Sequence, residues 1–195
     1  ALKQNRGDGI TFELGIFTNI TPEHSDYHPT FDDYKQMKLR LFELSKKTLA
    51  NLDCKEGEPF FTFPGVRTFS LEDKNADYFC KNAVFSKILG DENNISAEFE
   101  TENGEFPVSL SVIGKHNLSN ALAAFAASDI LGLSHEKTVL ALASFTGAEG
   151  RCEPVKNDLG INILIDYAHT PDAVLNIIKT ARSFTSGNII FVFGC

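Results

Sequence analysis

The sequence predicts an α/β protein built from two parts. Buried-strand patterns alternate with helical patterns along the chain, and a strand–helix–strand pattern closes it. Residues 146–151 contain two glycines and lack apolar periodicity, so they separate the parts. Of the 195 residues, 43% are apolar and 23% are charged, an ordinary balance for a globular protein. We expect the first part over residues 1–147 and the second over residues 148–195.

The net charge and the cysteines exclude several classes of protein. Asp and Glu number 26 against 18 Lys and Arg, so the formal net charge is −8 and no basic face for a nucleic acid is visible. No apolar run reaches the roughly 18 residues of a membrane span, and no charged-then-apolar leader opens the chain. The four cysteines form no CxxC pair, which favours reduced thiols over a zinc ribbon. We expect a cytoplasmic protein without nucleic-acid partners or membrane insertion.

The first part opens with a strand and a helix. Apolar side chains predict a buried strand over residues 10–20. Thr30 and Asp33 resemble a capping box, which predicts a helix over residues 31–47. From residue 49 to 112, short apolar runs separated by Gly, Pro, Asn and Asp predict several short strands with turns (60–63, 66–69, 83–88, 97–99 and 108–113).

Two further helices complete the first part. Residues 118–131 are rich in alanine and predict a helix that Gly132 stops. Ser134 caps a second predicted helix over residues 135–145.

The second part predicts one strand–helix–strand unit. The continuous apolar run 161–165 is typical of a strand covered on both faces. Pro171 begins a predicted helix over residues 171–184, and residues 188–193 predict another buried strand. These elements form one βαβ unit with a right-handed crossover, which does not complete a sheet. We therefore expect a truncation at Cys195.

One lysine occupies an unusual place in the predicted helix 31–47. Lys38 follows Tyr34 by four residues and precedes Leu41 and Phe42 by three and four, so it lies within the apolar stripe. One interpretation is a lysine that extends its ammonium group to solvent. The other is a lysine made anionic by modification, or one held by a carboxylate of a site.

The loop before that helix contains His24, Asp26 and His28. On an extended loop these alternate residues would lie on one side, where they could bind a divalent cation. The alternative is a polar loop whose aspartate caps its own backbone.

Three further segments offer ligand contacts. Residues 114–120 begin the alanine-rich helix, where Asn117 and Asn120 could pair with an adenine edge, or Asn117 could be a plain N-cap. Arg151 follows a glycine between the two parts, where it could reach a phosphate or be a surface arginine. Asp166 ends the strand 161–165, where α/β sheets bind ligands, or it complements a helix dipole.

The order of these segments resembles the Mur ligase family. The matching segments are FTNITPEHSDYHPTFDDYKQMKLRLF, GKHNLSNALAA, GRCEPV, DYAHTPDA and VFGC. Within the family, DYAHTPD favours the branch that adds the third amino acid of the peptidoglycan stem peptide. The resemblance implies an α/β fold, with the later part of the central ATPase domain over residues 1–147. The start of a Rossmann-like C-terminal domain follows over residues 148–195.

The resemblance also implies an activity. Members of the family use ATP and Mg²⁺ to form an amide bond. The carboxylate of UDP-MurNAc-L-Ala-D-Glu takes the γ-phosphoryl group, and the amine of meso-diaminopimelate or L-lysine attacks the acyl phosphate. Positioning and charge neutralisation provide most of the acceleration. We expect a monomeric ligase of peptidoglycan synthesis, on which cell shape and division depend.

The resemblance implies a role for each candidate residue. Lys38, carried as a carbamate, and His24 would bind Mg²⁺, which explains the place of the lysine in the apolar stripe. The remaining roles are adenine contact (Asn117, Asn120), phosphate contact (Arg151), ribose contact (Asp166), binding of the UDP-muramoyl peptide (Gln4, Arg6) and a hinge motif without an assigned role (Tyr167, His169).

Two family features are missing from the sequence, and other functions stay open. The phosphate-binding loop G-x-x-G-K-[ST] and its acidic metal ligand do not occur in these 195 residues, so this piece alone is not expected to turn over ATP. The alternatives are a folylpolyglutamate synthase-like ligase, a metal-dependent hydrolase that uses His24, Asp26 and His28, and a non-catalytic nucleotide-binding scaffold.

Overall fold

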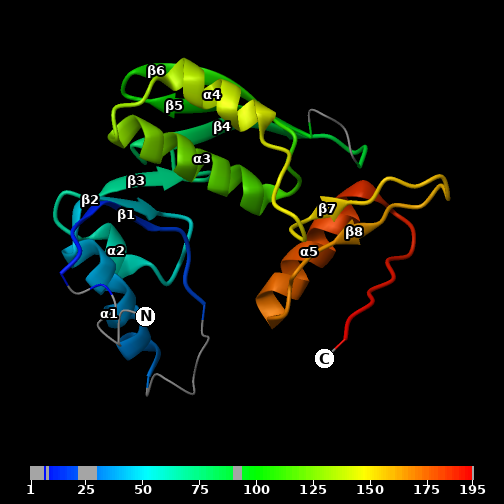
Figure 1. The fold of residues 1–195 in the computed structure, drawn as a ribbon, viewed down its shortest axis with the longest axis horizontal. Coiled ribbons are helices and arrows are strands. Elements are labelled where there is room, and N and C mark those ends of the chain that lie inside the picture. The colour runs from blue at the N-terminus through cyan, green and yellow to red at the C-terminus, as the bar shows by residue number, and fades with distance from the viewer. Residues whose placement is uncertain (1–6, 8, 22–29, 90–93, 195) are drawn as a thin grey trace.

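The computed structural model describes residues 7, 9–21, 30–89 and 94–194, and it confirms the predicted α/β class (Figure 1). The first part has the strands β1 (Phe12–Phe17), β2 (Ser45–Asn51), β3 (Arg67–Ser70), β4 (Tyr78–Phe85), β5 (Ile95–Thr101) and β6 (Gly104–Leu110). Its helices are α1 (Phe31–Glu43), α2 (Glu58–Phe61), α3 (Lys115–Ile130) and α4 (His135–Ser144). The second part has β7 (Glu153–Pro154), β8 (Leu164–Ile165) and α5 (Pro171–Phe184). No helix in these ranges is long and apolar enough to cross a membrane.

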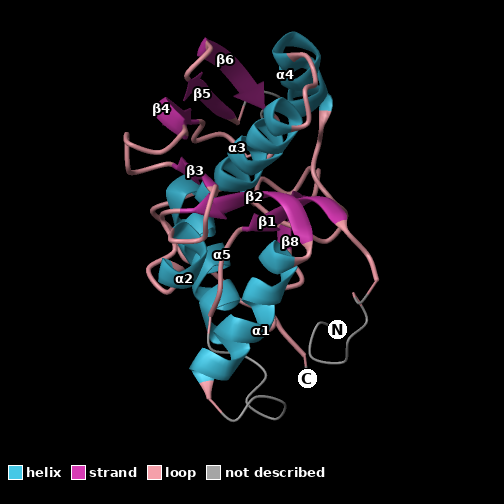
Figure 2. Ribbon diagram, turned by 90° about the vertical axis from the view of Figure 1, so that its left-hand side faces the viewer, coloured by secondary structure: helices cyan, strands magenta, loops and turns pink. Residues whose placement is uncertain are grey.

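The six strands of the first part form one sheet in chain order, from β1 to β6. The pairs from β1 to β4 are parallel, and β4, β5 and β6 form an antiparallel meander. Successive side chains of a strand point to opposite faces, so Leu49 and Ala50 of β2 belong to different hydrophobic clusters. Figure 2 shows the corresponding layers, with α3 and α4 on one side of the sheet and α1 and α2 on the other.

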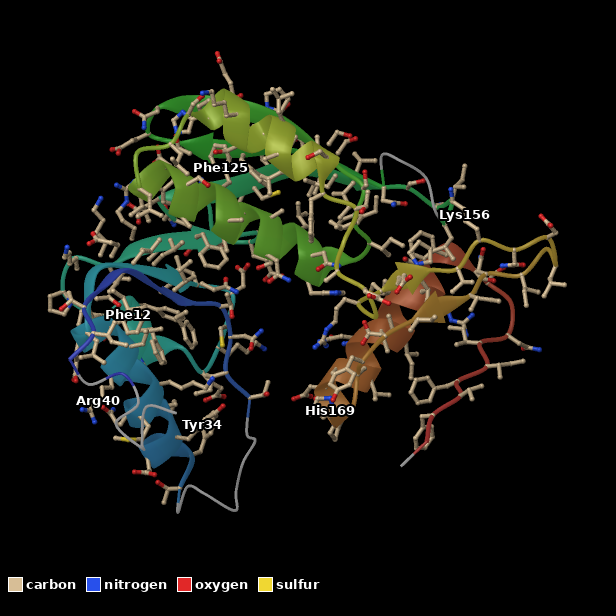
Figure 3. All side chains as sticks on the ribbon, in the orientation of Figure 1. Phe12, Tyr34, Arg40, Phe125, Lys156 and His169 are labelled. Carbon is tan, nitrogen blue, oxygen red and sulfur yellow. The ribbon has the colours of Figure 1, made fainter. Side chains whose placement is uncertain are left out.

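Helix α3 provides the main core contact. Phe125, which Figure 3 labels, is fully buried. The centre of its ring lies 5.4 Å from that of Phe99 of β5. Tyr78 of β4 is also fully buried and donates its hydroxyl to Oδ2 of Asp129 at 2.7 Å. Nε2 of His135, the first residue of α4, lies 2.6 Å from Oδ1 of the same carboxylate. The carboxylate of Asp129 therefore ties both helices to the sheet.

Three predicted helix boundaries in the first part carry the expected signals. Thr30 accepts from the amide of Asp33 at 3.1 Å, and Ser134 accepts from the amide of Lys137 at 3.4 Å. Gly132 has a φ of 79° and donates to the carbonyl of Asp129, while Leu133 donates to Ser128, which is a complete Schellman motif.

The predicted end of the first helix is wrong. Helix α1 ends at Glu43, and residues 45–47 belong to β2, where Ser45 and Lys47 pair with Phe12 and Leu14 of β1. The apolar run 60–63 is wrong as a strand as well, because Glu58–Phe61 forms helix α2. In both places contacts with the rest of the fold, and not the local sequence pattern, decide the conformation.

In the second part the helix is as predicted, but the strands are not. Strand β8 has two residues and pairs only with β7 in the described part of the chain, and Ile161 and Ile165 are 57% and 49% exposed. Residues 188–194 form no strand, and Val192 is 87% exposed. A strand needs a neighbour for its backbone groups, and the predicted βαβ unit is therefore absent among these residues.

Strand β6 lies at one end of the sheet and contains Pro107. Thr101 and Gly104 flank a two-residue turn, so the pair Glu98–Pro107 falls at a position without ladder hydrogen bonds. The nitrogen of Pro107 therefore faces away from β5, and the missing N–H breaks no bond of this sheet.

Candidate functional site

A cavity of about 1420 Å³ lies between the two parts of the chain. Asn51 at the carboxyl end of β2 lines it, as does Asn117 from the first turn of α3. Arg151 and Thr180 line it from the second part. The cavity thus lies where the parallel strands end, the usual place for ligands in open α/β sheets, and it has room for a nucleotide.

Asn117 and Asn120 are brought together, but neither caps the helix. Helix α3 begins at Lys115 after Gly114, which has a φ of 92° and no side chain, so the alternative interpretation of Asn117 as a plain N-cap is wrong. Nδ2 of Asn117 donates to the carbonyl of Ile113 at 2.8 Å, and its Oδ1 accepts from Asn120 at 3.4 Å. Both side chains line the cavity.

Arg151 and Asp166 line the same cavity from the second part. The guanidinium of Arg151 lies 5.0 Å from the ring centre of Tyr167, a cation–π contact that leaves the arginine exposed. The two oxygens of Asp166 accept from the amides of Cys152 and Ala168, both at 2.8 Å. These bonds hold the segment around Arg151 against the end of β8.

Tyr167 and His169 do not line the cavity, although they follow the lining residue Asp166 closely in the sequence. The amide of Tyr167 donates to the carbonyl of Gly150, and Nδ1 of His169 lies 3.0 Å from the carbonyl of Tyr167. Figure 3 shows His169 beside the first turn of α5.

Side-chain contacts between the two parts lie beside this cavity. The Sγ atom of Cys152 lies 3.6 Å from Nε2 of His116. Partial desolvation lowers the pKa of His116 and outweighs the opposing charge of Asp166, although the residue as a whole is exposed. Gly114 packs closely here, since a Cβ on it would lie 3.1 Å from Oγ1 of Thr180 on α5.

Sequence reasoning missed two polar residues at the end of β2. Nδ2 of Asn51 donates to the carbonyl of Thr18 at 2.8 Å, and its Oδ1 accepts from the amide of Asp53 at 3.0 Å. Asp53 in turn accepts from the hydroxyl of Ser70 and from the amide of Leu71. The available signal was two polar residues directly after a buried apolar run, at the carboxyl end of a parallel strand.

Lys38 lies on α1 and does not line the cavity. It is half-buried, and its Nζ lies 5.1 Å from the ring centre of Tyr34, while the described residues give it no carboxylate partner. Gln4, Arg6, His24, Asp26 and His28 all lie outside the described residues. Within the described ranges, no group of three or more His, Cys, Asp or Glu side chains could hold a metal ion.

The Mur ligase middle domain matches residues 1–128, and the glutamate ligase domain of Mur ligases matches residues 150–195. The chain belongs to the Mur ligase family. It is 36% identical to the UDP-N-acetylmuramoyl-L-alanyl-D-glutamate–2,6-diaminopimelate ligase of Clostridioides difficile (strain 630), over all of this chain and 40% of that protein. The chain therefore spans less than half the length of this curated relative.

Solved structures show the same fold. A structure of a UDP-N-acetylmuramoyl-L-alanyl-D-glutamate–2,6-diaminopimelate ligase has a TM-score of 0.77 and 28% identity, over 95% of this chain and 38% of that one. A MurF ligase from Thermotoga maritima in complex with ADP has a TM-score of 0.73, over 89% of this chain and 40% of that one. Its identity of 21% shows the fold alone.

Proposed function

We propose that this protein, at the length of its relatives, is an ATP-dependent ligase that joins 2,6-diaminopimelate to UDP-MurNAc-L-Ala-D-Glu in peptidoglycan synthesis. The observation that carries the proposal is a cavity that Asn117, Asn120, Arg151 and Asp166 line together, in a member of the Mur ligase family. The diamino acid follows from the name of the relative that is 36% identical over this whole chain. We further propose a cytoplasmic monomer, with the central domain ending near residue 147.

In this proposal the cavity binds ATP. Asn117 and Asn120 contact the adenine, because an amide group both donates and accepts as an adenine edge requires. Asp166 lies near the ribose. Arg151 contacts the phosphates with a planar group that keeps its charge at any working pH. Its stacking on Tyr167 supports this role, since it positions the guanidinium without neutralising it.

The transferred phosphoryl group requires further positive charge, which Mg²⁺ would supply by neutralising the phosphate oxygens. We propose His24 and a carbamate on Lys38 as ligands. The half-buried amine of Lys38 fits this role, because it has no carboxylate partner among the described residues and a carbamate offers the oxygen atoms that Mg²⁺ prefers. We place Gln4 and Arg6 at the UDP-muramoyl peptide, and Tyr167 and His169 in the hinge.

The test is the substrate dependence of phosphate release by the full-length protein with ATP and Mg²⁺. Release should require both UDP-MurNAc-L-Ala-D-Glu and meso-diaminopimelate, with the tripeptide product identified by mass spectrometry. Three results would contradict the proposal. Stimulation by a folate and glutamate would indicate a folylpolyglutamate synthase-like ligase, and turnover without ATP would indicate a hydrolase. Binding of ATP without any product would indicate a scaffold.

A further inference from the structure

The two parts of the chain meet at the start of α3. The Sγ atom of Cys152 lies 3.6 Å from Nε2 of His116 there. A second contact joins Thr180 of α5, which is only 9% exposed, to Gly114, where an added Cβ would lie 3.1 Å from Oγ1 of the threonine. These four residues all line the cavity, so the parts touch at the wall of the site proposed for the nucleotide.

The contact between Cys152 and His116 joins two uncharged groups near neutral pH. Burial raises the pKa of Cys152 to about 12, so its thiol keeps the proton. Partial desolvation lowers the pKa of His116, so its ring is neutral, and Nε2 accepts the thiol hydrogen when the ring proton is on Nδ1. A thiol is a weak donor, and the contact can therefore be broken at little cost.

Cys152 also determines where two candidate ligand residues lie. Its amide donates to Oδ2 of Asp166 at 2.8 Å, and Arg151 directly precedes it in the chain. Its φ of 45° is uncommon outside glycine, so the backbone of this segment has little freedom to adjust separately. Movement of Cys152 away from α3 would therefore carry Arg151 and Asp166 with it.

We propose that His116 and Cys152 are positioning residues that hold the second part in place for the nucleotide before it binds. This inference rests on the proposed function, which assigns Arg151 and Asp166 to ATP. Because the contact is weak, the arrangement in the structure exchanges with an open one, in which Cys152 is accessible to solvent. Loss of the contact increases the open fraction, and a nucleotide that touches both parts decreases it.

The experiment measures how fast iodoacetamide labels individual cysteines of the full-length protein, by peptide mass spectrometry. Cys80 on β4 is the internal reference, because it is 4% exposed in the core and reacts only when the first part unfolds. Cys152 should react faster than Cys80, through the open arrangement. In His116→Ala the rate at Cys152 should rise about threefold to fivefold, and the rate at Cys80 should stay the same.

A nucleotide and a conservative variant test the positioning role. ADP should slow the labelling of Cys152 and leave that of Cys80 unchanged. His116→Gln should restore the slow rate at Cys152, since its amide oxygen reaches the place of Nε2 and accepts from the thiol. In His116→Ala the KM for ATP should rise by no more than about twofold with kcat unchanged, because saturating ATP closes the cavity without the contact.

A second variant separates the two parts without removing the thiol or the ring. Gly114→Ala would place a Cβ 3.1 Å from Oγ1 of Thr180 and 2.9 Å from Cε1 of His116, so α5 or the ring must shift. Labelling of Cys152 should be faster in this variant too. Gly104→Ala is the matched control, since Gly104 also has a positive φ, of 130°, but no atom lies within 4 Å of the added Cβ.

The possible results distinguish this inference from the proposed function. If Cys152 reacts no faster than Cys80, or equally fast in the unchanged protein and in His116→Ala, the inference alone is overturned. A fall of kcat at saturating ATP in His116→Ala would have the same meaning. Failure of the unchanged protein to bind ADP would overturn the proposed function, and with it the role of this contact toward a nucleotide.

Discussion

The Sγ atom of Cys152 lies 3.6 Å from Nε2 of His116, so a thiol of the second part contacts a ring on the first turn of α3. The backbone of Cys152 has a φ of 45°, which is uncommon for any residue except glycine, and its amide donates to Asp166. A residue held in this way indicates that the surrounding contacts determine its conformation. Cys152 is therefore a sensitive point for probing how the two parts meet.

Cys152 should react slowly with thiol reagents in the folded protein. It is 3% exposed, and burial raises its pKa to about 12, so the reactive thiolate is scarce at neutral pH. Cys54 is only half-buried and should be alkylated first by iodoacetamide, as measured by peptide mass spectrometry. Rapid labelling of Cys152 before Cys54 would contradict the packing described here, and the unfolded protein provides the control in which both react.

The same thiol should make stability depend on pH in alkaline solution. An unfolded thiol loses its proton near pH 9.0, whereas folded Cys152 keeps it until about pH 12. Deprotonation between these values stabilises the unfolded state, so the free energy of unfolding should fall as the pH rises from 9 to 12. The fall should be smaller in Cys152→Ala, measured by urea unfolding at each pH. An equal slope in both proteins would contradict this assignment.

Substitution of Lys38 tests the proposed carbamate. Lys38→Ala should nearly abolish ligase activity of the full-length protein, and bicarbonate or a short carboxylic acid should partly restore it by supplying an oxygen ligand. Lys35→Ala is the matched control, because Lys35 lies on the same helix and pairs with Asp32 at 3.1 Å. Unchanged activity in Lys38→Ala would remove the carbamate from the mechanism.

Substitution of Asn51 should lower both the free energy of unfolding and the affinity of the cavity for ADP. Asn51→Leu removes the donor to Thr18 and the acceptor for Asp53, and it leaves two partly buried backbone groups unpaired. We expect a loss of about 2 kcal/mol in the free energy of unfolding and weaker binding of ADP. The same change at Asn75, which is exposed on a turn, should have little effect on either quantity. A fully stable Asn51→Leu protein would show that these bonds contribute little.

The core of the first part depends on Phe125. Phe125→Ala leaves a cavity between α3 and β5 and should cost about 3–5 kcal/mol in chemical unfolding. Leu140 on α4 is 70% exposed, so Leu140→Ala should stay within about 0.5 kcal/mol of the unchanged protein. Similar losses for both variants would show that α3 does not carry the core.

The sequence predicts those elements whose ends carry local signals. Thr30, Gly132 and Ser134 act within one helical turn, and the structure has them as expected. The end of α1 could not be found in this way, because residues 45–47 continue the predicted helix and become a strand only through pairing with β1. Residues 188–193 show the converse, since their apolar pattern predicts a strand but no described neighbour pairs with them.

In the candidate site, too, the residues in recognisable sequence segments could be predicted and those that depend on the fold could not. Asn117, Arg151 and Asp166 stand in recognisable segments, and the structure places all three on one cavity. The contact between Cys152 and His116 and the close approach of Gly114 to Thr180 could not be predicted, because each depends on chain segments that only the fold brings together.

Pro107 on β6 affects how readily a second chain can add to this edge of the sheet. An incoming chain that tried to extend the sheet at this edge would find a ring instead of a donor at Pro107, with the exposed carboxylate of Glu105 two residues away. Such an edge is a poor template for fibril growth. Aggregation during expression should therefore begin elsewhere, and removal of Pro107 would open a route to it.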